Sequence, residues 1–357
     1  MNDMSATKRM TSVGHCVRVL IVDDSLVMRS VVERHLELAP GFLVVGSVPG
    51  ASQALNFLAN NSVDVVILDI EMPNRSGLDA LPDILERANG ARVLVMSSLC
   101  KEGGPAVLQA LALGACDTLE KPGRQIYSQM FGTTLIERLE TLTSVRKPDQ
   151  REPVKLARTG PQVSALECLA IGASTGGIGA LHEFLDRLDG RIDAPILLTQ
   201  HLPDAFMPFL AKQLCDLGVR QVQVAEHGTI LEKGFIYVAP GNANLTCQKS
   251  GGGIRIALST DWNQTRYLPA VDPMLMSVAK CYGHAAAGVV LSGMGADGLL
   301  GARAMVDVGA PVYVQCPDTS VVWGMPGAIA KAGLATAVMA PGQIAEYIAT
   351  CWLEPQI

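Results

Sequence analysis

The first part of the chain alternates short apolar runs with segments of helical periodicity, and this alternation restricts the folds available to it. The apolar runs cover residues 17–22, 42–48, 63–68, 93–96 and 116–119. Strands buried on both faces read as continuous apolar runs, and strands that alternate with helices pair in parallel. The sequence therefore predicts an α/β fold over residues 17–143, a doubly wound (βα)5 domain.

Polar residues stand where these predicted strands end. They are Asp23, Asp24, Asp69, Ser97 and Lys121. Ligands bind at the carboxyl edge of such a sheet. Three carboxylates at one edge repel one another unless a cation joins them, and hard oxygen ligands suit Mg²⁺. A lysine and a hydroxyl beside that ion would neutralise and hydrogen-bond a phosphoryl group. The alternative is a set of acidic, solvated strand ends with no ligand.

Residues 144–164 interrupt the alternation. This stretch is charged and contains several prolines. Such a composition buries too little apolar surface to fold and is typical of a tether. The sequence therefore predicts a linker here, between a first domain at 17–143 and a second at 165–357.

The second domain repeats the α/β pattern. Apolar runs that read as strands cover residues 169–171, 195–199, 222–224, 235–238, 287–291 and 312–314. Two further runs, 245–248 and 254–258, flank a glycine-rich stretch, as in a β-hairpin. The pattern predicts a mostly parallel, doubly wound sheet with an antiparallel hairpin.

The glycine-rich stretch 172–177 follows the first strand of this second domain. Ser174 lies at the predicted break between strand and helix, where backbone N–H groups lack helical partners. Such donors can hold an oxyanion, and we expect the N–H groups of Thr175 and Gly176, with Met294 as a third, to do so. Ser174 is then placed for nucleophilic attack. The alternatives are a serine helix cap and a phosphate-binding loop.

His201 and Asp297 also follow predicted strands of the second domain. A serine nucleophile needs a base, and an imidazole base needs a carboxylate that fixes its tautomer. Together with Ser174, these two positions therefore predict a Ser-His-Asp triad. Taken singly, His201 could cap a helix and Asp297 could form an Asx-turn. The chain order Ser, His, Asp differs from the α/β-hydrolase order, although residues 172–176 match G-x-S-x-G.

Composition excludes several other classes of protein. The net charge is −6 and no basic run or basic helix-turn-helix stands out, so neither a nucleic-acid partner nor a transcription factor is expected. Nine cysteines occur without a C-x-x-C pair, which indicates reduced thiols in a cytoplasmic protein rather than a zinc site. No signal peptide and no apolar run of about 18 residues is present, so we expect no membrane insertion.

The segments VLIVDDS, VILDIEMP, VMSS and EKP of the first domain resemble a response-regulator receiver domain. The resemblance implies that Asp69 takes a phosphoryl group from a partner histidine kinase. It implies a Mg²⁺ site formed by Asp23, Asp24, Asp69 and the backbone carbonyl of Glu71. It also implies that Ser97 is the switch hydroxyl and Lys121 the amine that senses the phosphate.

The second domain resembles the catalytic domain of the chemotaxis protein-glutamate methylesterases. The resemblance rests on GASTGG, QHLP, YVAPG, VDPMLMSVA, LSGMGADG and VVWGMPG, in that order. It implies the triad Ser174, His201 and Asp297 without a cofactor in this domain. It further implies hydrolysis of glutamate methyl esters on chemoreceptors and deamidation of some receptor glutamines. The unphosphorylated receiver is then expected to cover the edge that carries Ser174.

Three positions depart from that family's usual pattern. Ser292 stands where threonine is usual, Asn244 where histidine is common, and Leu268 where arginine is common. We expect Asn244 and Leu268 to line the substrate face, which leaves the receptor substrate open. Two other functions also stay open, namely a demethylase of a different sensory partner and a receiver-regulated binding module without catalysis.

Overall fold

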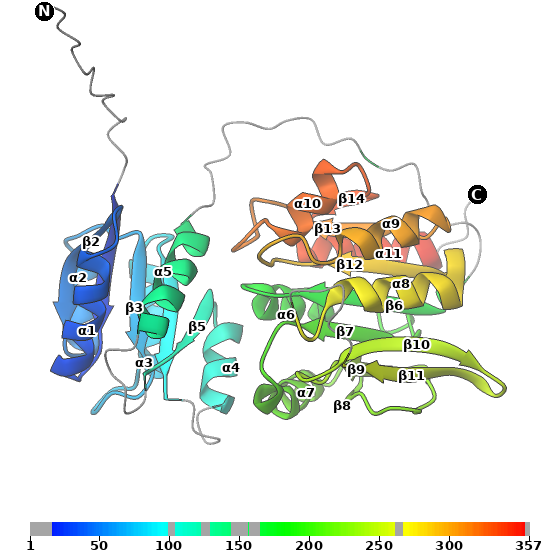
Figure 1. The fold of residues 1–357 in the computed structure, drawn as a ribbon, viewed down its shortest axis with the longest axis horizontal. Helices are drawn as coiled ribbons and strands as arrows, with labels where there is room; N and C mark the ends of the chain where they lie inside the picture. Colours follow the sequence, from blue (N-terminus) through cyan, green and yellow to red (C-terminus); the bar gives the residue numbers. More distant parts are fainter. Residues whose placement is uncertain are drawn as a thin grey trace, which may run out of the picture.

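The computed structural model describes residues 16–98, 104–122, 129–143, 156, 165–260 and 267–353. Two parallel α/β sheets lie side by side, the first formed by the N-terminal part of the chain and the second by the C-terminal part (Figure 1). The predicted linker lies outside the described residues, apart from Leu156. Across those ranges, none of the helices combines the length and the apolar character that crossing a membrane requires.

The first sheet has the strand order β2-β1-β3-β4-β5, with every pair parallel. Its strands are β1 (Val17–Val22), β2 (Phe42–Val48), β3 (Val65–Asp69), β4 (Arg92–Ser97) and β5 (Asp117–Glu120). Its helices are α1 (Leu26–Glu37), α2 (Ala51–Leu58), α3 (Gly77–Arg87), α4 (Gly104–Ala112) and α5 (Gln129–Thr143). The strand order reverses between β1 and β3, and at such a point the carboxyl edge of a sheet opens into a crevice.

The second sheet has the order β14-β13-β12-β6-β7-β9-β8 and is also parallel throughout. Its strands are β6 (Cys168–Ala173), β7 (Ile196–Gln200), β8 (Gln221–Val224), β9 (Phe235–Val238), β12 (Ala286–Val290), β13 (Val312–Gln315) and β14 (Ala337–Met339). The helices are α6 (Gly177–Arg187), η1 (Asp204–Phe206), α7 (Met207–Asp216), α8 (Val271–Tyr282), η2 (Gly283–Ala285), α9 (Leu299–Asp307), α10 (Met325–Lys331) and α11 (Pro341–Leu353). β6 lies between β12 and β7, which places its carboxyl end at the middle of the edge.

The antiparallel hairpin consists of β10 (Asn244–Ser250) and β11 (Gly253–Ser259). It forms a separate two-stranded sheet, and β10 packs against α8. The prediction of two parallel α/β sheets with one hairpin is therefore confirmed. The strand β14 was not predicted, because it has only three residues and too short an apolar run to stand out.

Helix α4 joins the two halves of the molecule. It contacts α6, α7 and η1 of the second half, and Figure 1 shows it on the side of the first sheet that faces the second. Gly104 lies against the ring of Phe209 so closely that an added Cβ would come within 2.8 Å of it. Gln213 Nε2 donates a hydrogen bond of 3.3 Å to the Leu108 carbonyl. One continuous hydrophobic cluster includes both Leu111 and residues of the second half, so the contact is apolar as well as polar.

Candidate functional site

The chain turns sharply where β6 ends, and this turn presents Ser174. Gly176 precedes α6 with φ of +72°, in the left-handed region that favours glycine. A Cβ at this position would also collide with the side chain of Val321. The Ser174 N–H donates to the Ser292 carbonyl at 3.0 Å, which ties the turn to the loop after β12. The side chain of Ser174 is thereby held at the carboxyl edge of the sheet.

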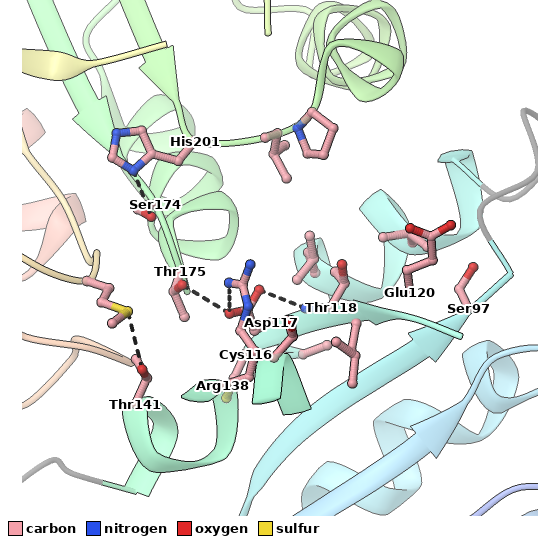
Figure 2. Close-up of a pocket in the computed structure, with 18 of the residues that line it drawn as sticks. Ser97, Cys116, Asp117, Thr118, Glu120, Arg138, Thr141, Ser174, Thr175 and His201 are labelled. Atoms are coloured by element: carbon pink, nitrogen blue, oxygen red, sulfur yellow. Dashed lines mark hydrogen bonds and ion pairs between the residues drawn. The ribbon is translucent and has the colours of Figure 1, made fainter. Parts of the chain in front are cut away.

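His201 and Asp297 meet Ser174 at this edge. His201 Nδ1 lies 3.1 Å from Ser174 Oγ, and His201 Nε2 lies 2.8 Å from Asp297 Oδ2. Figure 2 shows the contact between His201 and Ser174. Because a carboxylate oxygen only accepts, Nε2 carries the ring proton of the neutral imidazole and Nδ1 accepts from the serine hydroxyl. The histidine side chain is 10% exposed and that of Asp297 is 4% exposed.

Backbone donors hold the Asp297 carboxylate in place. Oδ2 accepts from the Val271 N–H at 2.7 Å, while Oδ1 accepts from the N–H groups of Asp272 at 3.0 Å and Gly298 at 2.9 Å. Burial acts to raise the pKa of Asp297, but His201 and the backbone donors outweigh it and lower that pKa below its usual value. The group is therefore ionised at neutral pH and stabilises a protonated imidazole.

The predicted oxyanion residues contact the first half of the molecule. The Gly176 N–H donates to the Cys116 carbonyl at 3.0 Å, and Thr175 Oγ1 donates to Asp117 Oδ2 at 3.1 Å. Thr141 Oγ1 donates to the Met294 sulfur at 3.2 Å. Figure 2 draws the contacts of Thr175 and Thr141. One of the expected oxyanion donors, the Gly176 N–H, is thus occupied by a carbonyl of the first half.

A cavity of about 780 Å³ lies between the two halves. Ser174 and His201 line one side, and residues of β5 and α5 line the other (Figure 2). Met294 is a further lining residue. Ser97 and Lys121 also line this cavity, so it extends from the serine toward the edge of the first sheet. The two predicted sites therefore share one crevice.

The carboxylates of the first sheet also come together. One oxygen from each of Asp23, Asp24 and Asp69 lies within 4.8 Å of the other two. Asp23 and Asp69 are fully buried and Asp24 is exposed. Lys121 Nζ lies 2.9 Å from Asp23 and 2.7 Å from Asp69. The Glu71 N–H donates to Asp69 Oδ1 at 3.0 Å, which sets Glu71 beside the group.

Burial shapes the charges of this cluster. It raises the pKa of Asp69 to about 6, against the lowering effect of the Lys121 ammonium. Burial acts to lower the pKa of Lys121, but the two carboxylates outweigh it and raise that pKa. Ser97, at the end of β4, is 5% exposed, and its hydroxyl donates to the Ser98 carbonyl at 3.3 Å. The cluster consists of hard oxygen ligands with one lysine, which fits a magnesium ion and a phosphoryl group.

Two of the sequence departures have structural explanations. Ser292 is buried. Its hydroxyl donates to the Thr175 carbonyl at 2.8 Å and accepts from the Val322 N–H at 3.0 Å, which are bonds that a hydroxyl residue can make. Asn244 was expected on the substrate face, and this was wrong. Its side chain is 3% exposed and its Oδ1 accepts from the Ala270 N–H at 2.8 Å, so it supports the chain before α8. Leu268 is half-buried, and its place on the substrate face stays a prediction.

The sequence did not reveal three residues of the site. Tyr267 stacks on the His201 ring, Asp117 bonds to Thr175, and Arg138 forms an ion pair with Asp117 at 2.6 Å. These contacts join residues that are far apart in the chain. Sequence patterns mark the ends of strands and helices, whereas each of these contacts is made only by the folded chain, and that between Asp117 and Thr175 also crosses between the domains.

Similar proteins identify the family. The chain matches the CheB methylesterase family over residues 169–348 and the response regulator receiver domain over residues 19–127. Protein-glutamate methylesterase/protein-glutamine glutaminase 2 of Caulobacter vibrioides is 39% identical over 344 residues, which cover 94% of this chain and 98% of that protein. Protein-glutamate methylesterase/protein-glutamine glutaminase 1 of Paramagnetospirillum magneticum is 36% identical over 363 residues, with 93% and 95% covered.

A solved structure gives the same result for the second half. The crystal structure of the Thermotoga maritima CheB methylesterase catalytic domain is 33% identical, with a TM-score of 0.50, and the match covers 52% of this chain and 98% of that one. The two parallel sheets, the Ser174–His201–Asp297 contacts and these matches lead to one conclusion: the chain belongs to the CheB methylesterase family and has a response regulator receiver domain ahead of its methylesterase domain.

Proposed function

We propose that this protein is a phosphorylation-activated serine hydrolase that removes methyl esters from glutamate side chains of chemoreceptors, and that it deamidates some receptor glutamines. The observation that carries the proposal is the hydrogen-bonded series Ser174 Oγ, His201 and Asp297, with distances of 3.1 and 2.8 Å. The names of the relatives support the substrate class, since they are called protein-glutamate methylesterases and protein-glutamine glutaminases.

Acylation begins with attack of Ser174 Oγ on the ester carbonyl carbon. His201 Nδ1 takes the hydroxyl proton, and the Asp297 carboxylate stabilises the imidazolium that forms. The carbonyl oxygen becomes an oxyanion, and we propose that the N–H groups of Thr175, Gly176 and Met294 receive it. One such donor contributes about 3–4 kcal/mol to the transition state. The C–O bond to the methoxy group then breaks, and methanol leaves with the proton from His201.

Deacylation repeats these steps with water as the nucleophile. His201 Nδ1 takes a proton from the water as it attacks the acyl-enzyme, and that proton returns to Ser174 as the C–O bond to the serine breaks. The product is a glutamate carboxylate. A glutamine side chain enters the same sequence, with ammonia leaving in place of methanol, which accounts for a glutaminase activity.

We propose that Asp69 accepts a phosphoryl group from a histidine kinase and that Mg²⁺ assists it. Asp23, Asp24 and Asp69 fit the ion, because their oxygens converge within 4.8 Å and two of the three carboxylates are buried. The Glu71 backbone carbonyl would be a further ligand. When bound, the ion would neutralise charge on the phosphoryl oxygens. Lys121 would bind the phosphoryl group, since its ammonium already reaches Asp69.

The contacts between the domains support a model of control in which the unphosphorylated receiver covers the serine. The Cys116 carbonyl occupies the Gly176 N–H, so that donor is withheld from an oxyanion. Strand β5, which follows Cys116, pairs with β4, where Ser97 lies opposite Glu120. A shift of Ser97 toward a phosphoryl group would therefore be passed to β5 and weaken the cover. Phosphorylation acts as an allosteric signal here if the uncovered arrangement binds phosphate better.

The proposed partners are a chemotaxis histidine kinase as phosphodonor and methylated chemoreceptors as substrates, and the proposed compartment is the cytoplasm. The receiver domain match supports the first partner and the methylesterase match supports the second.

The test is methanol release from membranes that carry methylated chemoreceptors, with and without a small-molecule phosphodonor and Mg²⁺. We expect release that rises with the phosphodonor and is abolished by Ser174→Ala in a folded protein. Folded wild-type protein that releases no methanol in either condition would instead favour another esterified partner or a non-catalytic binding module. Turnover retained by folded Ser174→Ala would exclude the serine mechanism.

A further inference from the structure

Tyr267 covers one face of the proposed catalytic base. Its ring stacks on the His201 imidazole with a centroid distance of 4.5 Å and an interplanar angle of 15°. Tyr267 is half-buried and lines the cavity that contains Ser174. The stacked tyrosine therefore belongs to the immediate surroundings of the histidine, although neither hydrogen bond of the imidazole involves it.

The segment that carries Tyr267 also holds the carboxylate of Asp297 in place. Immediately after it, the Ala270 N–H donates to buried Asn244, and the Val271 and Asp272 N–H groups donate to Asp297. One short piece of chain thus contacts the carboxylate through its backbone and the imidazole through a ring. Any displacement of this segment would move Asp297 and the ring over His201 together.

The phenol end of Tyr267 has little room. A Cβ added to Gly295 would lie 2.9 Å from the Tyr267 hydroxyl oxygen, so the phenol reaches over the loop that carries Met294. Gly295 has a φ of +80°, which lies in the left-handed region that favours glycine. The tyrosine therefore contacts the imidazole through its ring, while its hydroxyl lies beside Gly295 of this loop.

The two hydrogen bonds of His201 leave one motion of the ring weakly restrained. They run through the two ring nitrogens, from Nδ1 to Ser174 and from Nε2 to Asp297. Tilting of the ring about the line through these nitrogens changes both distances only slightly. The Tyr267 ring packed on one face of the imidazole opposes that tilt, because a tilted imidazole would run into the tyrosine ring on this side or lose the contact with it. An aromatic face also attracts the positive imidazolium that forms when His201 takes the serine proton.

We propose that Tyr267 is a positioning residue that holds the His201 ring in line with Ser174 and stabilises its protonated form. The proposal rests on the proposed serine-hydrolase function. It adds to that function a residue that touches the base and does not itself transfer a proton.

The test uses the full chain with phosphodonor and Mg²⁺, and compares wild type with Tyr267→Phe, Tyr267→Leu and Tyr267→Met. Two rates are measured: methanol release, with kcat and KM separated, and inactivation by phenylmethanesulfonyl fluoride, which sulfonylates Ser174 Oγ with loss of fluoride. The second rate reports the activation of the serine without a receptor. Thermal melting checks that each variant is folded. If one of the two aliphatic variants does not fold, the other still tests the proposal.

Tyr267→Phe keeps the ring and should retain both rates within about twofold of wild type. Tyr267→Leu and Tyr267→Met should lower kcat and the inactivation rate by roughly three- to tenfold, with KM unchanged, as the loss of an aromatic contact implies. The matched control is Phe235→Leu, which removes the stacked pair of Phe235 and Tyr237 in β9 of the same domain. It should leave both rates unchanged.

Three results would overturn the proposal. Aliphatic variants with wild-type rates would remove any role in positioning, while leaving the serine hydrolase intact. A raised KM with retained kcat and inactivation rate would make Tyr267 a substrate contact instead. A wild-type protein that neither releases methanol nor reacts with the sulfonyl fluoride would overturn the proposed function, and this inference with it.

Discussion

Thr175, the residue after the proposed nucleophile, donates a hydrogen bond of 3.1 Å from its hydroxyl to the carboxylate of Asp117 in the receiver. Arg138 holds the same carboxylate at 2.6 Å. The receiver therefore contacts the turn that carries Ser174 by a charged side chain, in addition to the backbone contact between Gly176 and Cys116. This relationship makes the covered state open to a direct test.

Asp117→Ala should raise methanol release in the absence of phosphodonor by roughly ten- to a hundredfold, because a hydrogen bond to a charged group contributes about 1.5–3 kcal/mol and this one favours the covered state. Release in the presence of phosphodonor should change little. The matched control is Asp64→Ala, which breaks the ion pair with Arg18 within the receiver. Equal basal rates for wild type and Asp117→Ala would show that this contact does not restrain the enzyme.

Asp69→Asn should abolish stimulation by a phosphodonor and keep basal methanol release. The amide cannot accept the phosphoryl group, while the methylesterase domain is unchanged. Removal of Mg²⁺ with EDTA should have the same effect on the wild-type protein, since the proposed ligands Asp23 and Asp24 then lack their ion. Stimulation that persists in Asp69→Asn would place the phosphorylation elsewhere.

Asp297→Asn should lower kcat by roughly 10³- to 10⁴-fold with little change in KM, the size of the effect when a triad carboxylate becomes an amide. Both oxygens of Asp297 accept hydrogen bonds, from His201 Nε2 and from backbone donors, and an amide has only one acceptor oxygen. The kinetics of methanol release measure this change. Asp307→Asn, at the exposed end of α9, is the control and should be neutral. A loss of less than tenfold in Asp297→Asn would contradict the role of this carboxylate.

Asp272→Asn should stabilise the fold at alkaline pH and not at acidic pH. Burial, together with the charge of Asp297, raises the pKa of Asp272 to about 6, against the backbone donors of α9. The folded state therefore binds this proton more tightly than the unfolded state, whose carboxyl has a pKa near 3.8. The stability due to the bound proton is complete below pH about 4 and is lost as the pH rises through 6.

The measurement for Asp272→Asn is the melting temperature at pH 8 and at pH 4.5. Asn can keep the hydrogen bond that Asp272 Oδ1 accepts from the Gly301 N–H, so only the charge is removed. We expect a rise of roughly 2 to 6 °C at pH 8, and a much smaller difference at pH 4.5. The same increase at both pH values would mean that the charge of Asp272 is not its cause.

Ser174 and His201 could be located from the sequence because each follows a buried strand directly. The strands β6 and β7 are neighbours, and Ala173 pairs with Gln200. The residues that follow them, Ser174 and His201, therefore lie next to each other. Asp297 was harder to place, because it lies on a loop several residues beyond β12. Its position depends on the Val271 and Asp272 N–H groups, which no local pattern reveals.

The supporting residues could not be predicted for the same physical reason. Tyr267 and Asn244 act through contacts with residues far away in the sequence. A polar residue beside a substrate and a polar residue that caps buried backbone look alike in a sequence, which explains why Asn244 was misplaced. The sequence also gives no sign of which ring nitrogen faces the serine, and here it is Nδ1 rather than the Nε2 of the serine-protease template.

The absence of a side chain at Gly104 has a consequence for how such a chain can change over evolution. Phe209 occupies the space that a Cβ would need, and the two residues belong to different domains. A receiver exchanged from another protein would bring its own residue to this place on α4, and any residue larger than glycine would require either the Phe209 ring or the domain contact to shift. At this place, substitutions in the receiver and in the enzyme are therefore expected to change together.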